Sequence, residues 1–345
     1  MLNYGLDVHK RYTTYCVMDD SGVILKEGRC ANDELLRLPA LSWKVKEERR
    51  AVMEAGGNWY HIYDLLEPVV GQLLLAHPLR VRAIAAARVK TDSIDAKTLA
   101  HLLRSDLIPE AYVPPAAVRE LREMLRYRLD LVKQRTALKN RVHALLAKEG
   151  LMPPLKYLFG RSGRQWLEEL PLTPRKRLEL DGFLSVLSCI QEHVHEAESL
   201  IQDQAASDPQ AQLLTTIPGI AALTALTILS EIGDVDRFPD ADHLVSYAGL
   251  APRVHSSGGK TRMGHITKQG PSALRWALIE AAHIAVRKPG RLQDKHRRLR
   301  RGKNAAVAIT ACARQLLVTV YCMLKRGDAF RPDGSSAGFM PSEVA

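Results

Sequence analysis

The sequence predicts an α/β domain followed by an all-α region, and three observations support this fold class. Short strand-like and helix-like segments alternate through the N-terminal part of the chain. After Ser93 the apolar residues recur at the spacing that is typical of amphipathic helices. The chain has 345 residues, which is long enough for two domains and a connector between them.

Five strands are expected in the N-terminal domain. Asn32 is expected to cap a helix that extends through Leu41, and a further helix is expected from Asn58. The resulting order, βββαβαβ, is that of the mixed sheet in the RNase H-like fold, which includes the RuvC-like resolvases. The expected strands are residues 2–9, 13–19, 23–29, 50–55 and 71–77.

The middle of the chain predicts two long helices. Pro109, Pro114 and Pro115 mark a break, and residues 116–148 then form an amphipathic pattern with no internal proline. A second long helix is predicted over residues 174–206. We interpret the pair as an antiparallel coiled-coil arm between two domains, with a plain helical linker as the alternative.

The C-terminal domain is expected to be helical and to begin with a helix-hairpin-helix over residues 213–233. Its hairpin, Pro218-Gly219-Ile220, would offer backbone amides to a DNA phosphate. Many such hairpins carry a second glycine where this chain has Ala221, so a packing role is the alternative. Two alanine-rich helices are expected to complete the core, over residues 271–287 and 303–325.

The charge balance favours a polyanionic partner. The formal net charge is +11 and the isoelectric point is near 9.5. Nine residues between Arg287 and Lys303 are lysine or arginine, and Asp294 is the single acid among them. The alternative interpretation of this run is a solvated loop, but such crowding of cations is unfavourable without a nearby anion.

Cysteine usage and hydropathy suggest a cytoplasmic protein. The five cysteines are scattered and form no Cys-x-x-Cys pair, which is typical of reduced structural thiols. No signal peptide is expected, because Asp7, His9 and Lys10 interrupt any apolar start. The apolar stretch from Ala305 to Leu324 contains Arg314 and is expected to be a buried helix, with no membrane partner.

Four carboxylates are candidates for a metal site. Asp7 lies within the first expected strand, and Glu54 lies at the end of another strand, where ligands gather in open α/β sheets. Asp92 and Asp95 are three residues apart, which places both on one helical face. Carboxylates that converge need a cation between them, and hard oxygen ligands suit Mg²⁺ or Mn²⁺. Taken singly, each acid could instead be an ordinary cap or surface group.

Residues 253–270 form a polar, basic, glycine-rich stretch that is expected to be a loop. Ser256 and Ser257 precede two glycines there, and a flexible loop of this kind can bring a hydroxyl and backbone amides close to a phosphate. Lys260, Arg262 and Lys268 would offset the developing negative charge.

Together these motifs resemble the DEDD-type insertion-sequence transposases of family one hundred and ten, the recombinases guided by a structured bridge RNA. The resemblance extends over nearly the whole chain and rests on the combination of motifs. They are GLDVHK, MEAGGNW, VKTDSIDAKTLA, IPGIAALTA, YAGLAP and SSGGKTRMGHITKQG. The four acids of the family correspond to Asp7, Glu54, Asp92 and Asp95, and its serine corresponds to Ser257, with Ser256 as an adjacent alternative.

The resemblance implies a DNA transposase that cuts and rejoins strands through a phosphoserine link, assisted by a divalent metal. It also implies a guide RNA. We further expect a homo-oligomer, dimer or tetramer, in which the complete site is shared between protomers, because the acids and the serine are far apart in the sequence. The expected domains are a RuvC-like DEDD domain over residues 1–112 and a coiled-coil connector over 113–210. A serine transposase domain over 211–328 and a flexible tail over 329–345 complete the chain.

Three rival functions share parts of this pattern. A RuvC-like junction endonuclease would use the four acids and water, so Ser257 would be dispensable. A kinase of the actin-like fold shares the strand order, but Asp7 is followed by Val-His-Lys, and the chain has no second glycine-rich phosphate loop. In a purely structural DNA-binding protein, the acids would have no catalytic part.

Overall fold

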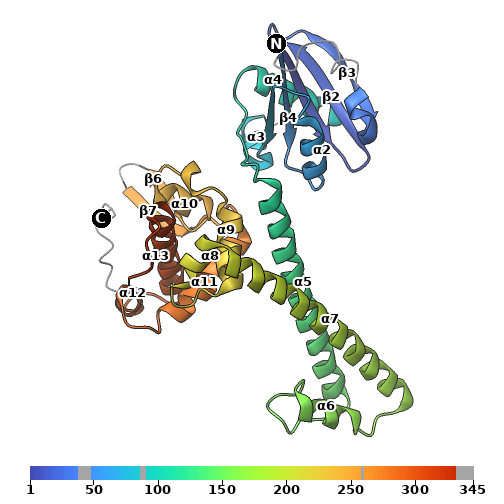
Figure 1. The fold of residues 1–345 in the computed structure, drawn as a ribbon, viewed down its shortest axis with the longest axis vertical. Helices are drawn as coiled ribbons and strands as arrows, with labels where there is room; N and C mark the ends of the chain where they lie inside the picture. The colour runs from blue at the N-terminus through green and yellow to red at the C-terminus, as the bar shows by residue number, and fades with distance from the viewer. Residues whose placement is uncertain (38–47, 86–90, 258–259, 332–345) are drawn as a thin grey trace. The chain divides into compact units, whose positions relative to one another are not determined.

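The computed structural model describes residues 1–37, 48–85, 91–257 and 260–331 (Figure 1). Contacts divide the chain into two compact units, Met1–Pro114 and Pro115–Ala345. The first unit contains a mixed β-sheet, and the second is largely helical, so the predicted fold class is confirmed. The finer boundaries expected at residues 210 and 328 stay predictions.

The sheet of the first unit has five strands in the order β3-β2-β1-β4-β5. The first three strands pair antiparallel, whereas β4 pairs parallel with both β1 and β5. This is the mixed sheet that the sequence predicts, and each strand lies within about two residues of its expected bounds. The strands are β1 Leu2–Val8, β2 Tyr12–Asp19, β3 Ile24–Ala31, β4 Arg49–Glu54 and β5 Gln72–Ala76.

Helices cover both faces of this sheet. Successive residues of a strand point to opposite faces, so Leu2, Tyr4 and Leu6 of β1 pack on one side with helix α2 (Trp59–Leu66). The other face packs against helix α4 (Asp92–Arg104), through Cys16 and Val52 of the sheet. Helix α3 (Pro78–Ile84), which the sequence analysis did not predict, also packs on this second face.

Helix α4 lies unusually close to strand β1 because residue 5 is glycine. A Cβ atom built at Gly5 would lie 2.1 Å from the carbonyl oxygen of Ala96 and 2.5 Å from the amide nitrogen of Ala100. Both neighbours are backbone atoms of α4, which cannot rotate away as a side chain can. Gly5 together with the small residues Ala96 and Ala100 therefore fixes where α4 crosses the sheet.

The helix expected from Asn32 to Leu41 is not an α-helix where it is described. Residues Asn32–Arg37 form a 3₁₀ helix, and residues 38–41 lie outside the described residues. The Asn32 side chain accepts a hydrogen bond from the Thr13 hydroxyl and donates one to the His9 carbonyl oxygen. These long-range contacts engage the side chain that the prediction assigned to an N-cap.

The second unit begins with two long antiparallel helices, α5 (Ala116–Lys148) and α7 (Pro174–Ser207). Leu131 and Leu138 of α5 share a core cluster with Leu187 and Val194 of α7, which fixes the antiparallel register. The far end of the pair is closed by the short helix α6 (Arg161–Glu168), which the sequence analysis did not predict. The predicted pair of long helices is thus present and packed.

A compact helical core forms the rest of the second unit. Its helices share one large cluster of buried residues with Leu125 of α5 and Ile201 of α7. The basic stretch after Val286, interpreted above as a possible loop, is helical as α12. The helices are α8 Pro209–Thr215, α9 Ala222–Ile232, α10 Ala241–Tyr247, α11 Ser272–Ala285, α12 Arg291–Arg300 and α13 Ala305–Arg326.

Helix α13 is long and apolar enough to cross a membrane by length and composition alone. In the structure, one face of α13 is buried, including Cys312, Leu316 and Val320, and packs into the core of the second unit. The prediction of a buried helix at this position is confirmed.

The hairpin between α8 and α9 is shaped by packing. Gly219 has a φ of 95°, a conformation that L-residues with a Cβ rarely adopt. A Cβ at Gly219 would lie 2.6 Å from the carbonyl oxygen of Ala281 and 2.9 Å from the Cβ atom of Ile284, both on α11. The glycine is therefore accounted for by close contact with α11, and phosphate binding by this hairpin stays a prediction.

We expect Gly5→Ala to destabilise the first unit, because the added methyl group meets the α4 backbone. Overpacking of a core costs about 1–3 kcal/mol, and a backbone clash places this change at or above the upper end. Chemical denaturation measures the loss. The matched control is Gly57→Ala, because a Cβ at Gly57 has no atom within 4 Å. Equal stabilities of the two variants would contradict the close approach of α4 to β1.

Candidate active site

Asp7 and Glu54 lie on neighbouring parallel strands and on the same face of the sheet. Leu6 is the register partner of Met53, so the next residues along the two strands, Asp7 and Glu54, lie side by side at the strand ends. Leu6 and Met53 are buried on the α2 face, which places both acids on the α4 face. The sequence-based placement of Glu54 at the end of its strand is confirmed.

Asp92 and Asp95 lie in the first turn of α4, on the same face of the sheet. The Thr91 side chain caps the helix by accepting a hydrogen bond from the amide of Ile94, at 3.3 Å. The N-cap is therefore Thr91, and Asp92 is the first helical residue. The positive end of the helix dipole favours carboxylates in this turn.

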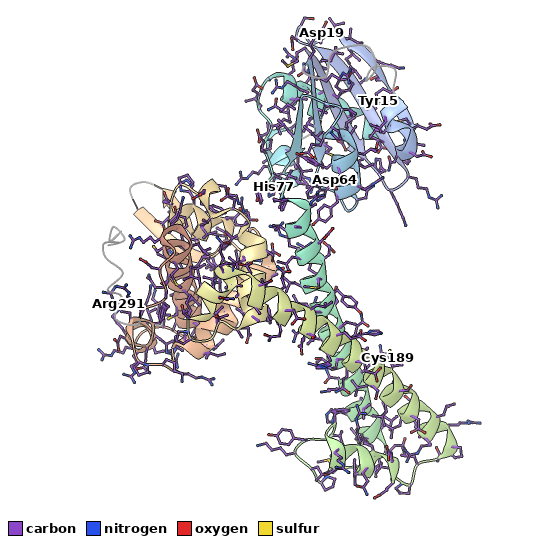
Figure 2. The ribbon with its side chains drawn as sticks, viewed as in Figure 1. Tyr15, Asp19, Asp64, His77, Cys189 and Arg291 are labelled. Carbon is purple, nitrogen blue, oxygen red and sulfur yellow. The ribbon has the colours of Figure 1, made fainter. Side chains whose placement is uncertain are left out.

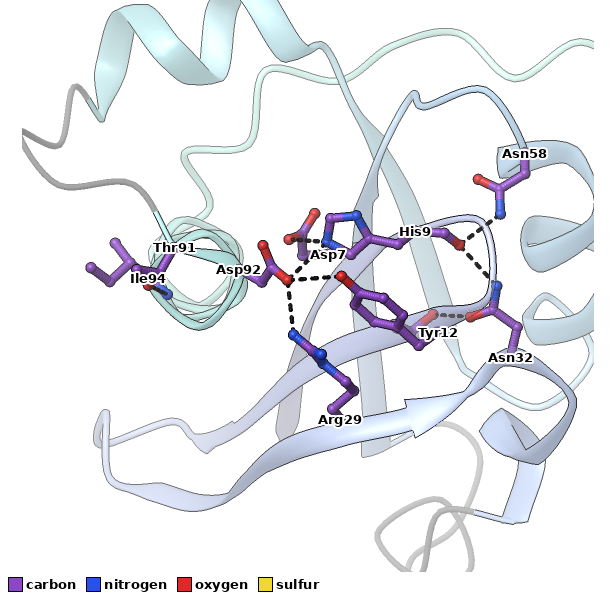
Figure 3. Close-up of polar contacts among 10 residues, drawn as sticks. Asp7, His9, Tyr12, Arg29, Asn32, Asn58, Thr91, Asp92 and Ile94 are labelled. Atoms are coloured by element: carbon purple, nitrogen blue, oxygen red, sulfur yellow. Dashed lines mark hydrogen bonds and ion pairs between the residues drawn. The ribbon is translucent and has the colours of Figure 1, made fainter.

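His9 links two of the acids. Its Nε2 atom lies 3.0 Å from Oδ2 of Asp7 and 3.3 Å from Oδ2 of Asp92 (Figure 3). Among the described residues, the potential ligand atoms of Asp7, His9 and Asp92 all lie within 4.8 Å of one another. The structure thus brings Asp7 and Asp92 together, from positions 85 residues apart in the sequence.

The pKa of Asp7 reflects its burial and the charged groups around it. Burial raises the pKa of Asp7, and the neighbouring carboxylates Asp92 and Asp95 raise it further, while His9 lowers it. Asp95 is therefore close enough to Asp7 for their charges to interact. Glu54 shares the face through its strand register but is not part of the tight group formed by Asp7, His9 and Asp92.

Two residues that the sequence analysis missed, Tyr12 and Arg29, also bind the Asp92 carboxylate. The Tyr12 hydroxyl donates a hydrogen bond to Oδ2 of Asp92 at 3.2 Å, and the Arg29 guanidinium donates another at 3.1 Å. The guanidinium also lies over the Tyr12 ring, 4.0 Å from its centroid. Asp92 therefore accepts hydrogen bonds from two groups of the sheet, and the His9 imidazole lies 3.3 Å from the same oxygen.

The backbone of His9 is also fixed by hydrogen bonds. The side-chain amides of Asn32 and Asn58 each donate a hydrogen bond to the His9 carbonyl oxygen, both at 2.9 Å (Figure 3). The His9 amide in turn donates to the carbonyl oxygen of Tyr12. These bonds fix the turn between β1 and β2 and so direct the imidazole toward the acids.

This donor set fits a hard divalent cation. The acids supply carboxylate oxygens, the ligand type that Mg²⁺ and Mn²⁺ prefer, and His9 adds a nitrogen that Mn²⁺ accepts. Burial raises the pKa of Asp7 most, and repulsion by Asp92 and Asp95 adds to it. An added cation at this position would relieve that repulsion.

Ser257 lies in the second unit, at the end of a β-hairpin. Strand β6 (Pro252–Ser257) pairs antiparallel with β7 (Lys260–Ile266), and Ser257 is the register partner of Lys260. The loop expected over residues 253–270 is therefore mainly two paired strands. Residues 258–259, the glycines between them, lie outside the described residues.

The base of this hairpin is fixed to the helical core. Gly270 has a φ of 104°, and a Cβ there would lie 1.9 Å from the carbonyl oxygen of Tyr247. The Arg275 guanidinium donates hydrogen bonds to the carbonyl oxygens of Ala248 and Gly270, which joins the two ends of the hairpin segment. The serine pair thus lies at the far end of a hairpin whose base is anchored.

Two family profiles match this chain. A transposase profile of the DEDD type from the IS110 group matches residues 4–149, which include all four candidate acids. A profile described as the Transposase IS116/IS110/IS902 family matches residues 211–297, which include Ser257. The chain belongs to the IS110/IS116 family of transposases. As a member of that family it is a transposase enzyme.

Individual relatives agree with this assignment. The transposase for insertion sequence element IS1111A of Coxiella burnetii is 28% identical over 342 residues, covering 95% of this chain and 90% of the relative. A probable family 20 transposase of Pseudomonas aeruginosa is 29% identical, covering 75% and 80% of the two chains. A pilin gene-inverting protein of Moraxella bovis is 37% identical over 139 residues, 39% of this chain and 43% of that protein.

We expect Asp7→Asn to raise the melting temperature of this transposase at neutral pH in chelator. The raised pKa of Asp7 means that its neutral form stabilises the fold at low pH, and that this stability is lost as the pH rises through that pKa. Asparagine removes the half-buried charge at similar volume, so we expect a gain of about a few degrees. Thermal unfolding at neutral and acidic pH measures the difference, which shrinks as the pH falls.

The control for this prediction is Asp33→Asn, because Asp33 is an exposed carboxylate of the same unit. We expect the Asp33 variant to melt like wild type at both pH values. Addition of Mn²⁺ is expected to stabilise wild type more than Asp7→Asn. A lower melting temperature for Asp7→Asn in chelator at neutral pH would show that the charge at Asp7 is not a net cost to the fold.

Proposed function

We propose that this transposase cuts and rejoins DNA strands through a covalent link to Ser257, assisted by a divalent metal at the four acids. A structured RNA guides it to its target, and it acts as a homo-oligomer. The observation that carries the proposal is the convergence of Asp7 and Asp92 around His9, with Asp95 and Glu54 on the same face. The family membership makes DNA the substrate of this chemistry.

The residues that would hold the metal are Asp7, Glu54, Asp92 and Asp95, with Mg²⁺ or Mn²⁺ as the ion. When bound, such an ion polarises a phosphate oxygen and stabilises charge on the attacking and leaving oxygens. The chain's own contribution is to hold the carboxylates in place before any ion arrives. Tyr12 and Arg29 fix the orientation of Asp92, and the bonds to the His9 carbonyl fix the turn beside Asp7.

The proposed covalent step exchanges one phosphodiester for another. The Ser257 oxygen attacks the scissile phosphorus, loses its proton to a base or solvent, and forms a new phosphorus–oxygen bond. The bond to the neighbouring deoxyribose oxygen breaks, and that oxygen leaves as a hydroxyl after taking up a proton. A hydroxyl of another DNA end then reverses the exchange, so joining needs no nucleotide cofactor.

The inversion activity named for one relative supports rejoining. The Moraxella bovis protein is named for inverting a pilin gene, and inversion requires each cut end to join a new partner. An enzyme that used water would leave free ends that need a ligase. The free state of all five cysteines supports action in the reducing cytoplasm.

We expect wild-type protein incubated with labelled target DNA and Mg²⁺ to leave a protein-linked fragment on denaturing electrophoresis. Ser257→Ala should lack this fragment while still binding DNA, because the alanine offers no oxygen to phosphorus. Ser256→Ala is the matched control, since it removes the adjacent hydroxyl of the same strand. Loss of the adduct in Ser256→Ala alone would identify Ser256 as the nucleophile.

A RuvC-like endonuclease that uses water is the rival function. The observation that favours it is that all four acids lie in the first compact unit, whereas Ser257 lies in the second. Under this rival, neither serine variant loses cleavage, and no adduct forms in wild type. Asp7→Asn abolishes cleavage under both functions, so it serves as the negative control for the assay.

Guidance by RNA and oligomer formation are tested on the purified protein. We expect nuclease-treated protein to lose selective recombination and to regain it when its RNA is restored. Selection of the target would then be delegated to base pairing, as in other guided systems.

Light scattering of the active complex should give more than one protomer. Normal selectivity without RNA would refute guidance, and a monomeric active complex would refute the oligomer.

A further inference from the structure

The exposed cations on and beside α12 point to a second nucleic-acid contact: we infer that this helix binds the phosphate backbone of duplex DNA. The inference rests on the proposed function only in taking DNA as the substrate. It assigns a role to a surface distinct from the carboxylates and from Ser257.

Eight of the nine cations in this segment are exposed. None of the eight has an ion pair with an acid among the residues that the structure describes. Arg300 donates a hydrogen bond to the carbonyl oxygen of Lys303, which orders the end of the helix without neutralising charge. The exposed cations are Arg287, Lys288, Arg291, Arg297, Arg298, Arg300, Arg301 and Lys303.

The helix that carries these cations is anchored on the core of its unit. Leu292 packs against the large core cluster, and its carbonyl oxygen accepts a weak hydrogen bond from the Cys312 thiol of α13. The ninth cation, Lys295, donates from Nζ to Gln315 of α13 at 3.0 Å, and burial lowers its pKa. Lys295 thus faces the core, and α12 presents the remaining cations from a fixed support.

Helical spacing places Arg297 and Arg301 away from the anchored face, with Arg298 on its flank. Leu292 and Lys295 lie toward α13, Arg298 follows Lys295 by three residues, and all three arginines are exposed. Arg291 begins the helix at the surface of the second unit (Figure 2). A surface of this form can meet a polyanion without moving any buried residue.

The exposed arginines of α12 lie close enough to repel one another. The ten residues of this helix span about 15 Å and carry four exposed arginines and one acid, Asp294, so these arginines lie within about two Debye lengths of one another at physiological salt. A duplex carries one negative charge per ~1.7 Å of its axis, or roughly nine over that length. Phosphate contact would therefore offset the mutual repulsion of the arginines and release condensed counterions.

The composition of the segment favours a duplex over a single strand. Residues 287–304 contain no phenylalanine, tyrosine or tryptophan. Proteins that bind single strands combine positive charge with aromatic side chains on which the bases stack. Cations without aromatic neighbours suit backbone contact, in which the bases stay paired.

The test compares the salt dependence of binding to labelled duplex DNA of random sequence, with chelator present so that no strand is cut. The variant replaces Arg297, Arg298 and Arg301 with alanine. We expect the slope of log affinity against log salt to fall by about 2–3, at ~0.9 per phosphate contact. If affinities at about 1 M salt are unchanged, binding at about 0.15 M salt weakens roughly 100-fold.

Two controls make the result specific to α12. Replacing the same three arginines with lysine keeps the charge and should keep the slope. Replacing Arg80, Arg82 and Arg175 with alanine removes equal charge from exposed positions on α3 and α7 and should change the slope by less than 1. An equal fall in both alanine triples would overturn the inference, because general charge would then explain it.

The identity of the nucleic acid is tested in the same assay. Repeating it with single-stranded DNA and with duplex RNA should give a smaller change in slope than duplex DNA does. An effect confined to RNA would overturn the inference. All proteins carry Ser257→Ala as well, so binding is measured without any covalent chemistry. If Ser257 is not the nucleophile, or if the acids hold no metal, these slopes are unaffected. If α12 does not bind DNA, adduct formation at Ser257 is unaffected.

Discussion

The close approach of α4 to β1 is the constraint on which the candidate site depends. Asp7 is carried by the strand, and Asp92 and Asp95 are carried by the helix, so their separation is set by how near the helix can lie. Gly5, two residues before Asp7 on the same face, removes the side chain that would hold α4 away. The contact with Ala96 and Ala100 is backbone to backbone and therefore leaves little freedom for the helix to shift.

Bringing these carboxylates together has an electrostatic cost that the first unit offsets from several directions. The first turn of α4 supplies a positive dipole end, and the Thr91 cap holds that turn in place. His9 lies between Asp7 and Asp92, and Arg29 approaches Asp92 from β3. Burial, more than the neighbouring carboxylates, keeps the pKa of Asp7 raised despite this compensation. A bound cation would favour the charged form of Asp7.

Local patterns in the sequence were sufficient to predict most of the first unit and its acids. Strand alternation placed Asp7, the strand end placed Glu54, and the three-residue spacing placed Asp92 and Asp95 on one helical turn. Their convergence as a complete set was not a local property, because it depends on the register of β1 with β4 and on where α4 crosses the sheet. The alternation of β1 could be interpreted because one face is apolar along its length.

The neighbours of the acids could not be predicted in this way. Tyr12 and Arg29 reach Asp92 only because β2 and β3 pair in a particular register and α4 crosses them at a particular height. Contacts of this kind depend on distances across 63 to 80 residues of sequence, on which composition gives no information. The one local signal was His9, two residues from Asp7 and therefore able to project from the same turn.

The second unit shows why polar segments are hard to predict. The serine segment was expected to be a loop because it is polar and rich in glycine, yet β6 and β7 pair along nearly its whole length. Pro252 and Val254 are the only apolar residues in the sequence of β6, so its apolar alternation stops after two residues. Helix α12 was obscured in the same way by its charge, since Leu292 and Leu299 are its only aliphatic residues.

Both units place charged elements on an apolar support that contains small residues. In the first, glycine and alanine let α4 lie against the sheet, and the acids follow from that contact. In the second, α11 and α13 present alanine-rich faces to the core, and α12 is held against α13 through Lys295 and Cys312. In the first unit, larger side chains at Gly5, Ala96 or Ala100 would add buried area but would move α4, and with it Asp92 and Asp95, away from Asp7. The placement of charge thus accounts for the small residues at these positions.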